Sequence, residues 1–218
     1  MPINYEPIDA TTDVATTRTL LHEVIPLTGT IVSGTYGTFP NDDNIKNYSH
    51  GMFQSVYDYP YLSSSANHIF DLTAGFDESS PLSGSASSVQ ETKKINMYNQ
   101  FSQVLLGYTG STNRVRLFES DLTLNEDSPM KETIFVNLSR LLTKDEIKKG
   151  SVSITLGTAS WAAPFGGVIF YQAGVMVLTS SIWAGTTDFF SQSGTARTFD
   201  NQLVSGSISG SADAFRHR

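Results

Sequence analysis

The sequence contains no cysteine and has few charged residues for its length of 218 residues. Without thiols the chain can form no disulfide bond, thiolate metal site or cysteine nucleophile. Charged residues make up 16% of the chain, whereas ordinary soluble domains have about 25%. Because hydroxyl and amide groups cost less free energy to bury than ions, this composition favours a surface that other subunits cover. A secreted β protein would have a similar composition.

The sequence also lacks a concentration of basic residues, and its net charge is −7. The densest basic stretches are 93–94 and 144–149, and acidic residues interrupt the second. Nucleic-acid affinity depends on several Lys and Arg residues that displace counterions from phosphates, so we predict no dedicated nucleic-acid site. No stretch approaches the roughly 18 apolar residues of a membrane span, and residues 1–6 do not resemble a signal peptide. These features predict synthesis in a cytoplasm and no membrane span.

The motifs of common catalytic sites are missing as well. No glycine-rich phosphate loop occurs, and the stretch 206–210 places Ile208 where a serine nucleophile would stand. The histidines are scattered and lack metal-binding spacing: His22, His50, His68 and His217. We therefore predict a protein that is not an enzyme, with no catalytic residue, cofactor or metal site. A site built from distant histidines and a paired-carboxylate glycosidase stay open as alternatives. Calcium binding by one of the acidic loops, at 42–43, 77–78 or 126–127, also stays open, although no Asp-x-Asp-x-Asp-Gly run is present.

Several segments have the composition and periodicity of β-strands. The apolar runs 167–171 and 175–178 flank the glycine-containing turn 172–174 and predict a buried β-hairpin. Residues 151–156 alternate polar and apolar side chains in strict period two. Further strands are expected within 11–38, 114–124 and 134–136. The pattern as a whole predicts a mainly β fold, namely an antiparallel β-sandwich or barrel.

One principal α-helix is predicted at about 89–106. Ser88 and Glu91 have the spacing of a capping box, in which each side chain accepts a hydrogen bond from a backbone N–H of the first turn. Apolar residues follow at near-helical spacing, and Gly107 ends the element. A second capping pattern at 143–146 predicts one or two helical turns. We expect an N-terminal arm at 1–20, a single mainly β domain at 21–190, and an extended C-terminal arm or edge strand at 191–218.

Aromatic residues are dense between positions 48 and 76 and supply candidate subunit contacts. Tyrosine combines a large apolar area with a polar tip and is enriched at protein interfaces. The alternative is that these rings pack inside the core. The candidate contact residues are Tyr57, Tyr59, Tyr61, Phe76 and Phe215. The polar loop 79–88 is a further candidate, and Trp161 and Trp183 either pack in the core or form platforms for sugar rings.

Three stretches resemble virion structural proteins of tailed bacteriophages, particularly T4-like contractile-tailed phages of marine and cyanobacterial hosts. They are YDYPYLSSSANHIFDL (57–72), FVNLSRLLTKDEIKKG (135–150) and GVIFYQAGVMVL (167–178), and they cover less than half of the chain. The resemblance implies a structural component of the neck, tail or baseplate that packs against copies of itself and other virion proteins. It implies synthesis in the host cytoplasm and retention in the virion, where terminal arms lie across neighbouring subunits. The alternatives are a receptor- or carbohydrate-binding β module of a tail or fibre, with a host-surface glycan as ligand, and a hydrolase.

Overall fold

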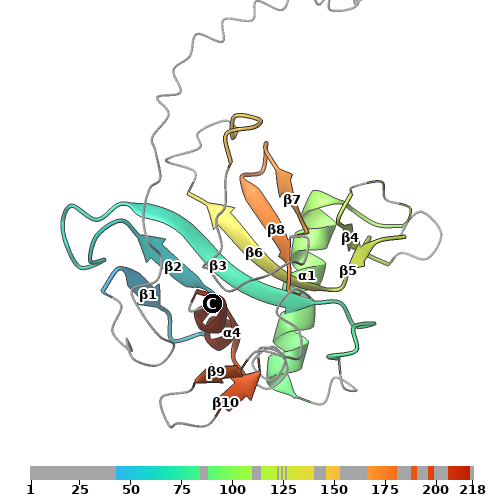
Figure 1. Ribbon diagram of the computed structural model, residues 1–218, viewed down its shortest axis with the longest axis horizontal. Helices are drawn as coiled ribbons and strands as arrows, with labels where there is room; N and C mark the ends of the chain where they lie inside the picture. Colours follow the sequence, from blue (N-terminus) through green and yellow to red (C-terminus); the bar gives the residue numbers. More distant parts are fainter. Residues whose placement is uncertain are drawn as a thin grey trace, which may run out of the picture.

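The structure is a computed structural model, and its centre is a six-stranded antiparallel sheet (Figure 1). The residues that it describes are 43–83, 88–109, 114–121, 123, 125, 127–139, 146–152, 166–180, 188–190, 196–198 and 206–216. The strand order is β1-β2-β3-β6-β8-β7, and the strands are β1 (Ile45–Asn47), β2 (Gln54–Tyr57), β3 (His68–Phe76), β6 (Glu132–Leu138), β7 (Gly167–Phe170) and β8 (Val175–Thr179).

Two short hairpins and two helices complete the described structure. One hairpin pairs β4 (Phe118–Glu119) with β5 (Pro129–Met130), and the other pairs β9 (Asp188–Phe190) with β10 (Ala196–Thr198). The helices are α1 (Val89–Leu105) and α4 (Ile208–Arg216). Within the described ranges, neither helix is long and apolar enough to cross a membrane. The mainly β class is confirmed, but a sandwich or barrel is not, because the large sheet is not closed between its edge strands β1 and β7.

The β7–β8 hairpin confirms the strand pair predicted around residues 172–174. Val168 lies opposite Val177 and Ile169 opposite Met176 in this antiparallel pair. Gly174 has φ of +72°, a left-handed backbone conformation that side-chain-bearing residues rarely adopt. The turn therefore depends on glycine at this position, and every residue of β8 is buried.

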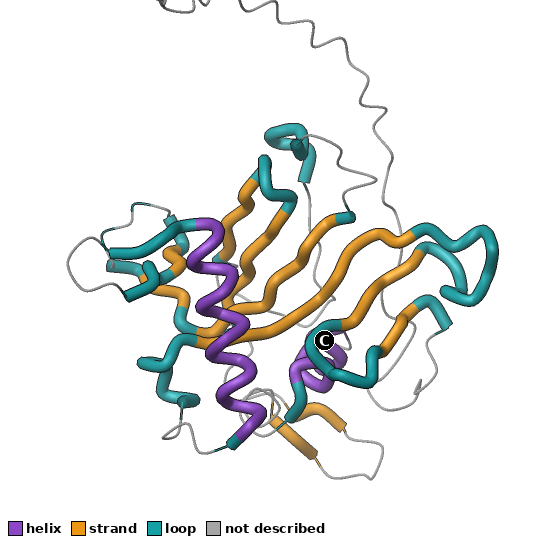
Figure 2. The backbone as a smooth tube through the Cα atoms, turned by 180° about the vertical axis from the view of Figure 1, so that it is seen from behind, coloured by secondary structure: helices purple, strands orange, loops and turns teal. Residues whose placement is uncertain are grey.

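The two faces of the large sheet carry separate apolar clusters because side chains alternate along each strand. On β6, Ile134 and Val136 belong to the first cluster, whereas Phe135 between them belongs to the second. Helix α4 contributes Ile208 and Ala212 to the first cluster. Helix α1 contributes Tyr98 to the second, and it crosses the sheet in the view from behind (Figure 2).

Helix α1 begins and packs as the sequence predicts. Ser88 Oγ accepts from the N–H of Glu91 at 3.1 Å, and the Glu91 carboxylate accepts in turn from the N–H of Ser88. Gly75 of β3 allows the helix to approach closely, since a Cβ atom there would lie 2.8 Å from the carbonyl oxygen of Lys94. The buried Tyr98 hydroxyl donates to the carbonyl of Met130 at 2.9 Å and accepts from the N–H of Phe118 at 3.0 Å, which fixes the β4–β5 hairpin beside the helix.

Helix α4 corrects the prediction of an extended arm or edge strand for the last part of the chain. Ile208, Ala212 and Phe215 are spaced to lie on one side of the helix; the first two are fully buried, and Phe215 packs against the first cluster. Ser207 starts the helix by accepting the N–H of Gly210 at 3.0 Å. The prediction was based on the Ser- and Gly-rich composition of this stretch, which is typical of an extended arm, and not on the helical spacing of its apolar residues. Residues 196–198 do form a strand, but it pairs with β9 in a separate hairpin.

Several predicted features lie outside the described residues. They are the N-terminal arm at 1–20, the strands within 11–38, residues 143–145 of the predicted helical turns, most of the strand at 151–156, and both tryptophans. These features stay predictions.

Candidate functional site

The connection between β2 and β3, residues 58–67, carries the most concentrated exposed apolar surface of the described chain. It projects beyond the end of the sheet at the left of Figure 1. Tyr59 is 60% exposed, Tyr61 37% and Leu62 86%. These three residues are called the aromatic tip below. Other exposed large apolar side chains of the described ranges occur singly: Val89, Val104, Tyr108 and Val152.

Hydrogen bonds close the base of this connection. The backbone N–H of Asn67 donates to Asp58 Oδ1 at 2.7 Å, and the Asn67 side-chain amide donates to Asp58 Oδ2 at 2.9 Å. The backbone N–H of Asp58 donates back to the carbonyl of Asn67 at 3.2 Å. The hydrogen bond from the Asn67 side-chain amide lowers the pKa of Asp58 most, and the one from the Asn67 backbone N–H lowers it further. This carboxylate therefore stays ionised at neutral pH. These contacts within the chain order the base of the loop.

Two further contacts hold the tip against the sheet. The backbone N–H of Tyr61 donates to the carbonyl of Asp43 at 2.8 Å. The ring of Tyr57, which is half-buried, lies 6.3 Å from the ring of Tyr61 and 5.4 Å from the ring of His68, centroid to centroid. Tyr57 therefore connects the exposed tip to the polar side chains on the sheet.

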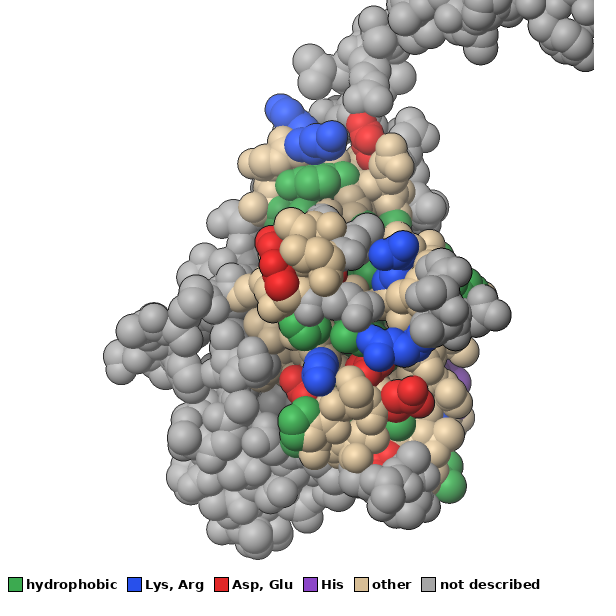
Figure 3. All heavy atoms as spheres, turned by 90° about the vertical axis from the view of Figure 1, so that its right-hand side faces the viewer, with side chains coloured by type: hydrophobic (Ala, Val, Ile, Leu, Met, Phe, Trp, Pro, Cys, Tyr) green, Lys and Arg blue, Asp and Glu red, His purple; other side chains and the backbone are tan. Residues whose placement is uncertain are grey.

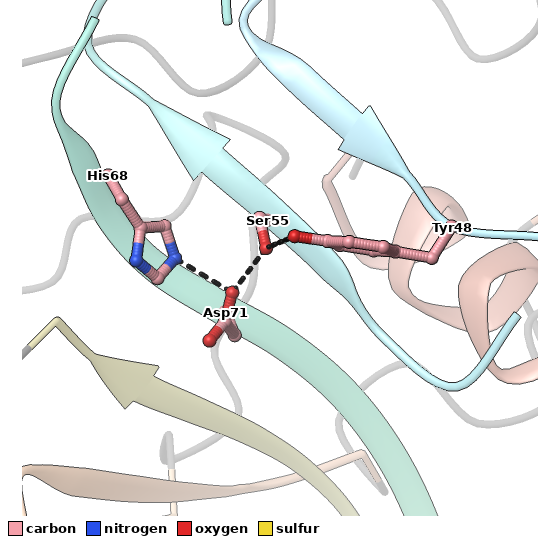
Figure 4. Close-up of polar contacts among 4 residues, drawn as sticks. All are labelled: Tyr48, Ser55, His68 and Asp71. Atoms are coloured by element: carbon pink, nitrogen blue, oxygen red, sulfur yellow. Dashed lines mark hydrogen bonds and ion pairs between the residues drawn. The ribbon is translucent and has the colours of Figure 1, made fainter. Parts of the chain in front are cut away.

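A polar cluster lies next to Tyr57 and joins three segments of the sheet region (Figure 4). Ser55 Oγ on β2 donates to Asp71 Oδ1 on β3 at 2.5 Å, and the same oxygen lies 2.7 Å from His68 Nε2. The Tyr48 hydroxyl, just after β1, is 3.1 Å from Ser55 Oγ. Tyr48 also stacks on His50, with ring centroids 5.2 Å apart.

The order of groups in this cluster does not match that of a serine hydrolase. In such enzymes a histidine contacts the serine and removes its proton, while the carboxylate orients the histidine from behind. Here the carboxylate of Asp71 stands between Ser55 and His68, and Ser55 is only 2% exposed. This geometry gives the Ser55 hydroxyl no histidine base. It cross-links neighbouring strands at the base of the aromatic tip instead.

The predicted contact residues divide into two groups. Tyr57, Tyr59 and Tyr61 lie together at the tip and its base, as described above. Phe76 is completely buried, so its prediction as a contact residue is wrong: β3 extends through residue 76 and places this ring inside the sheet region. Phe215 is half-buried against the first apolar cluster, and that packing occupies the side chain within its own chain.

The polar cluster was not predicted from the sequence. The residues that contact each other in this cluster are 3 to 16 positions apart in the sequence and form no recognisable motif. Ser55 and Asp71 meet because they are register partners in the β2–β3 pair. The connecting loop is long, so only knowledge of this register could have placed them together.

The remaining visible surface has mixed charge. On the side that faces right in Figure 1, acidic and basic side chains are interspersed, and apolar side chains appear in small separate groups (Figure 3).

No family model matches the chain, and neither the curated proteins nor the solved structures that were searched contain a match.

Proposed function

We propose that this chain is a structural subunit of a tailed-phage virion, and that it assembles by packing against copies of itself and other virion proteins. The observation that supports a contact role is the aromatic tip. Tyr59, Tyr61 and Leu62 are exposed on a loop whose base is closed by hydrogen bonds. Because the loop is already ordered, it loses little further conformational entropy when a partner covers it.

The size of the tip limits what it can do alone. Full burial of a large apolar side chain contributes about 1.5–3 kcal/mol, and Tyr61 is already more than half covered. Association costs about 4–15 kcal/mol in lost translational and rotational freedom. The tip by itself therefore gives a weak contact, and a stable assembly requires each subunit to make several. Closed symmetric assemblies supply such repeated contacts.

The placement in a virion rests on the resemblance of residues 57–72, 135–150 and 167–178 to tailed-phage structural proteins. The first of these stretches contains the whole aromatic tip. The same resemblance supports synthesis in the host cytoplasm and contacts made by the arm at 1–20. The low charged fraction of 16% is consistent with a surface that other subunits cover.

A double variant, Tyr59→Ser with Leu62→Ser, tests the contact role. Sedimentation velocity over a wide range of protein concentration is expected to show weak self-association of the wild-type chain and its loss in the variant. Val104→Ser is the matched control, because Val104 is 83% exposed but lies on helix α1. Equal association of the wild-type chain and the tip variant would contradict a role of the tip in self-assembly.

A carbohydrate-binding module is the second candidate, because the exposed Tyr59 directly follows Asp58, whose carboxylate accepts from the Asn67 amide. Exposed aromatic rings next to such polar groups can stack on a sugar and hydrogen bond to its hydroxyls. Screening the wild-type chain and the tip variant on a glycan array separates the two functions. Glycan binding that the tip variant loses would favour the module over the assembly subunit.

A further inference from the structure

The β4–β5 hairpin holds a second group of polar side chains, remote in sequence from the aromatic tip. Its strands are anchored beside helix α1, because Phe118 is fully buried and Met130 is 4% exposed within the second apolar cluster. The backbone pairs Phe118 with Met130 and Glu119 with Pro129. The connecting loop, residues 120–128, therefore starts and ends at fixed points.

Oxygen-bearing side chains occupy every second position of this loop. Asp121, Thr123, Asn125 and Asp127 follow Glu119 at the same spacing. Thr123 Oγ1 lies 2.7 Å from Asn125 Oδ1, 3.2 Å from Asp121 Oδ1 and 3.4 Å from Glu119 Oε2. The Thr123 hydroxyl has one proton and can donate it to only one of these three oxygens. The other two oxygens receive no hydrogen bond from it.

Three carboxylates meet at the same place. One oxygen from each of Glu119, Asp121 and Asp127 lies within 4.8 Å of the others. Among the described residues, no lysine, arginine or histidine nitrogen forms an ion pair with any of them. Like charges at this separation repel each other, and a divalent cation placed between them would remove the repulsion.

Glu119 provides an independent sign of a ligand. Its side chain is fully buried, and Glu119 Oε1 has no hydrogen-bond partner. Burying a carboxylate oxygen without a partner costs several kcal/mol in order of magnitude, unless a cation or a donor compensates. The other buried side-chain oxygen of the described chain without a hydrogen bond, Ser128 Oγ, belongs to the same hairpin.

From these contacts we infer that the β4–β5 loop binds a calcium ion through Glu119, Asp121, Thr123, Asn125 and Asp127. Ca²⁺ takes about six to eight oxygen ligands in flexible geometry, and loops that bind it often supply ligands from alternate residues. Mg²⁺ demands a nearly ideal octahedron and keeps several waters, which suits this mixed set of carboxylate, hydroxyl and amide oxygens less well.

The position of Glu119 would connect a bound ion to the interior of the protein. An ion held by Glu119 would couple this loop to the second apolar cluster, because Glu119 directly follows the buried Phe118.

Calcium titration of the full chain after treatment with a chelator tests this inference. Isothermal titration calorimetry is expected to show one Ca²⁺ per chain, a weaker response to Mg²⁺, and a rise in Tm when Ca²⁺ is added. Glu119→Gln, and separately Asp121→Asn with Asp127→Asn, are expected to weaken Ca²⁺ binding at least about tenfold, since each removes charged ligands.

Glu78→Gln is the matched control, because Glu78 is an exposed acid outside this hairpin. It is expected to bind Ca²⁺ as the wild-type chain does. The Asp121→Asn/Asp127→Asn variant alters two exposed residues, so it keeps the test valid if the buried Glu119→Gln variant fails to fold. No heat or Tm shift with Ca²⁺ in the folded wild-type chain, tighter binding of Mg²⁺, or undiminished binding in the folded loop variants would overturn the inference.

Discussion

His68 Nε2 and Ser55 Oγ both contact one oxygen of Asp71, at 2.7 Å and 2.5 Å. This shared carboxylate oxygen links β2 to β3 next to the point where the aromatic tip leaves the sheet. His68 extends the connection through its ring contact with Tyr57. The tip is therefore supported by a set of polar contacts that spans neighbouring strands.

Replacing Asp71 with Asn removes the charge that both partners contact. Hydrogen bonds to charged groups contribute about 1.5–3 kcal/mol each, and an Asn oxygen retains part of this. We expect Asp71→Asn to lower the free energy of unfolding by about 1–3 kcal/mol, measured by urea denaturation. Glu78→Gln, which changes an exposed acid outside both this cluster and the β4–β5 loop, serves as the control. Equal stability of Asp71→Asn and the wild-type chain would show that the cluster is not stabilising.

Truncation of Phe76 and truncation of Leu62 are expected to have very different effects on the free energy of unfolding. Phe76 is fully buried, whereas Leu62 is 86% exposed. Phe76→Ala should lower the free energy of unfolding by about 3–5 kcal/mol because it leaves a cavity. Leu62→Ser should change it by less than about 0.5 kcal/mol in the monomer. Urea denaturation of both variants measures the difference, and a mild effect of Phe76→Ala would return this residue to the list of surface contacts.

Deleting residues 206–218 distinguishes a packed helix from a terminal arm. The deletion removes Ile208 and Ala212, which are fully buried in the first apolar cluster. We expect a lower Tm and binding of a hydrophobic dye, because the face of the sheet beneath α4 becomes exposed. Removing 217–218 alone is the control. A truncated chain with unchanged Tm would indicate that the helix contributes nothing to the core.

Lys94 is expected to make stability depend on pH in the alkaline range. Burial lowers the pKa of Lys94 from 10.5 to about 8, and the nearby Glu91 carboxylate partly opposes this shift. Between these two values the unfolded chain binds more protons than the folded chain, so the free energy of unfolding rises with pH. The rise is on the order of 3 kcal/mol at most.

The comparison of the wild-type chain with Lys94→Met isolates this effect. Urea denaturation at pH 7 and pH 9.5 should show a larger gain for the wild-type chain than for the variant. The range ends there because burial also raises the pKa of Tyr98, whose ionisation in the unfolded chain lowers stability at higher pH. Parallel pH profiles of the two proteins would contradict a buried Lys94 with a lowered pKa.

The elements that sequence patterns predicted correctly have short-range causes. The capping box of Ser88 and Glu91 involves residues within one helical turn, and Gly174 forms a turn between adjacent strands. Tyr57, Tyr59 and Tyr61 were grouped by sequence proximity, and the structure keeps them together. The Ser- and Gly-rich stretch around α4 contained a helical spacing of apolar residues, but its composition favoured an arm.

Local sequence patterns were sufficient to predict a mainly β chain with one principal helix, and to locate that helix and the β7–β8 hairpin. Periodicity, caps and turns act between residues that are close along the chain, so they can be read directly. The burial of Phe76, the link that Asp71 makes between Ser55 and His68, and the burial of Glu119 beside the loop acids became evident from the folded chain alone. These relationships depend on strand register and on packing between distant segments, which no local pattern specifies.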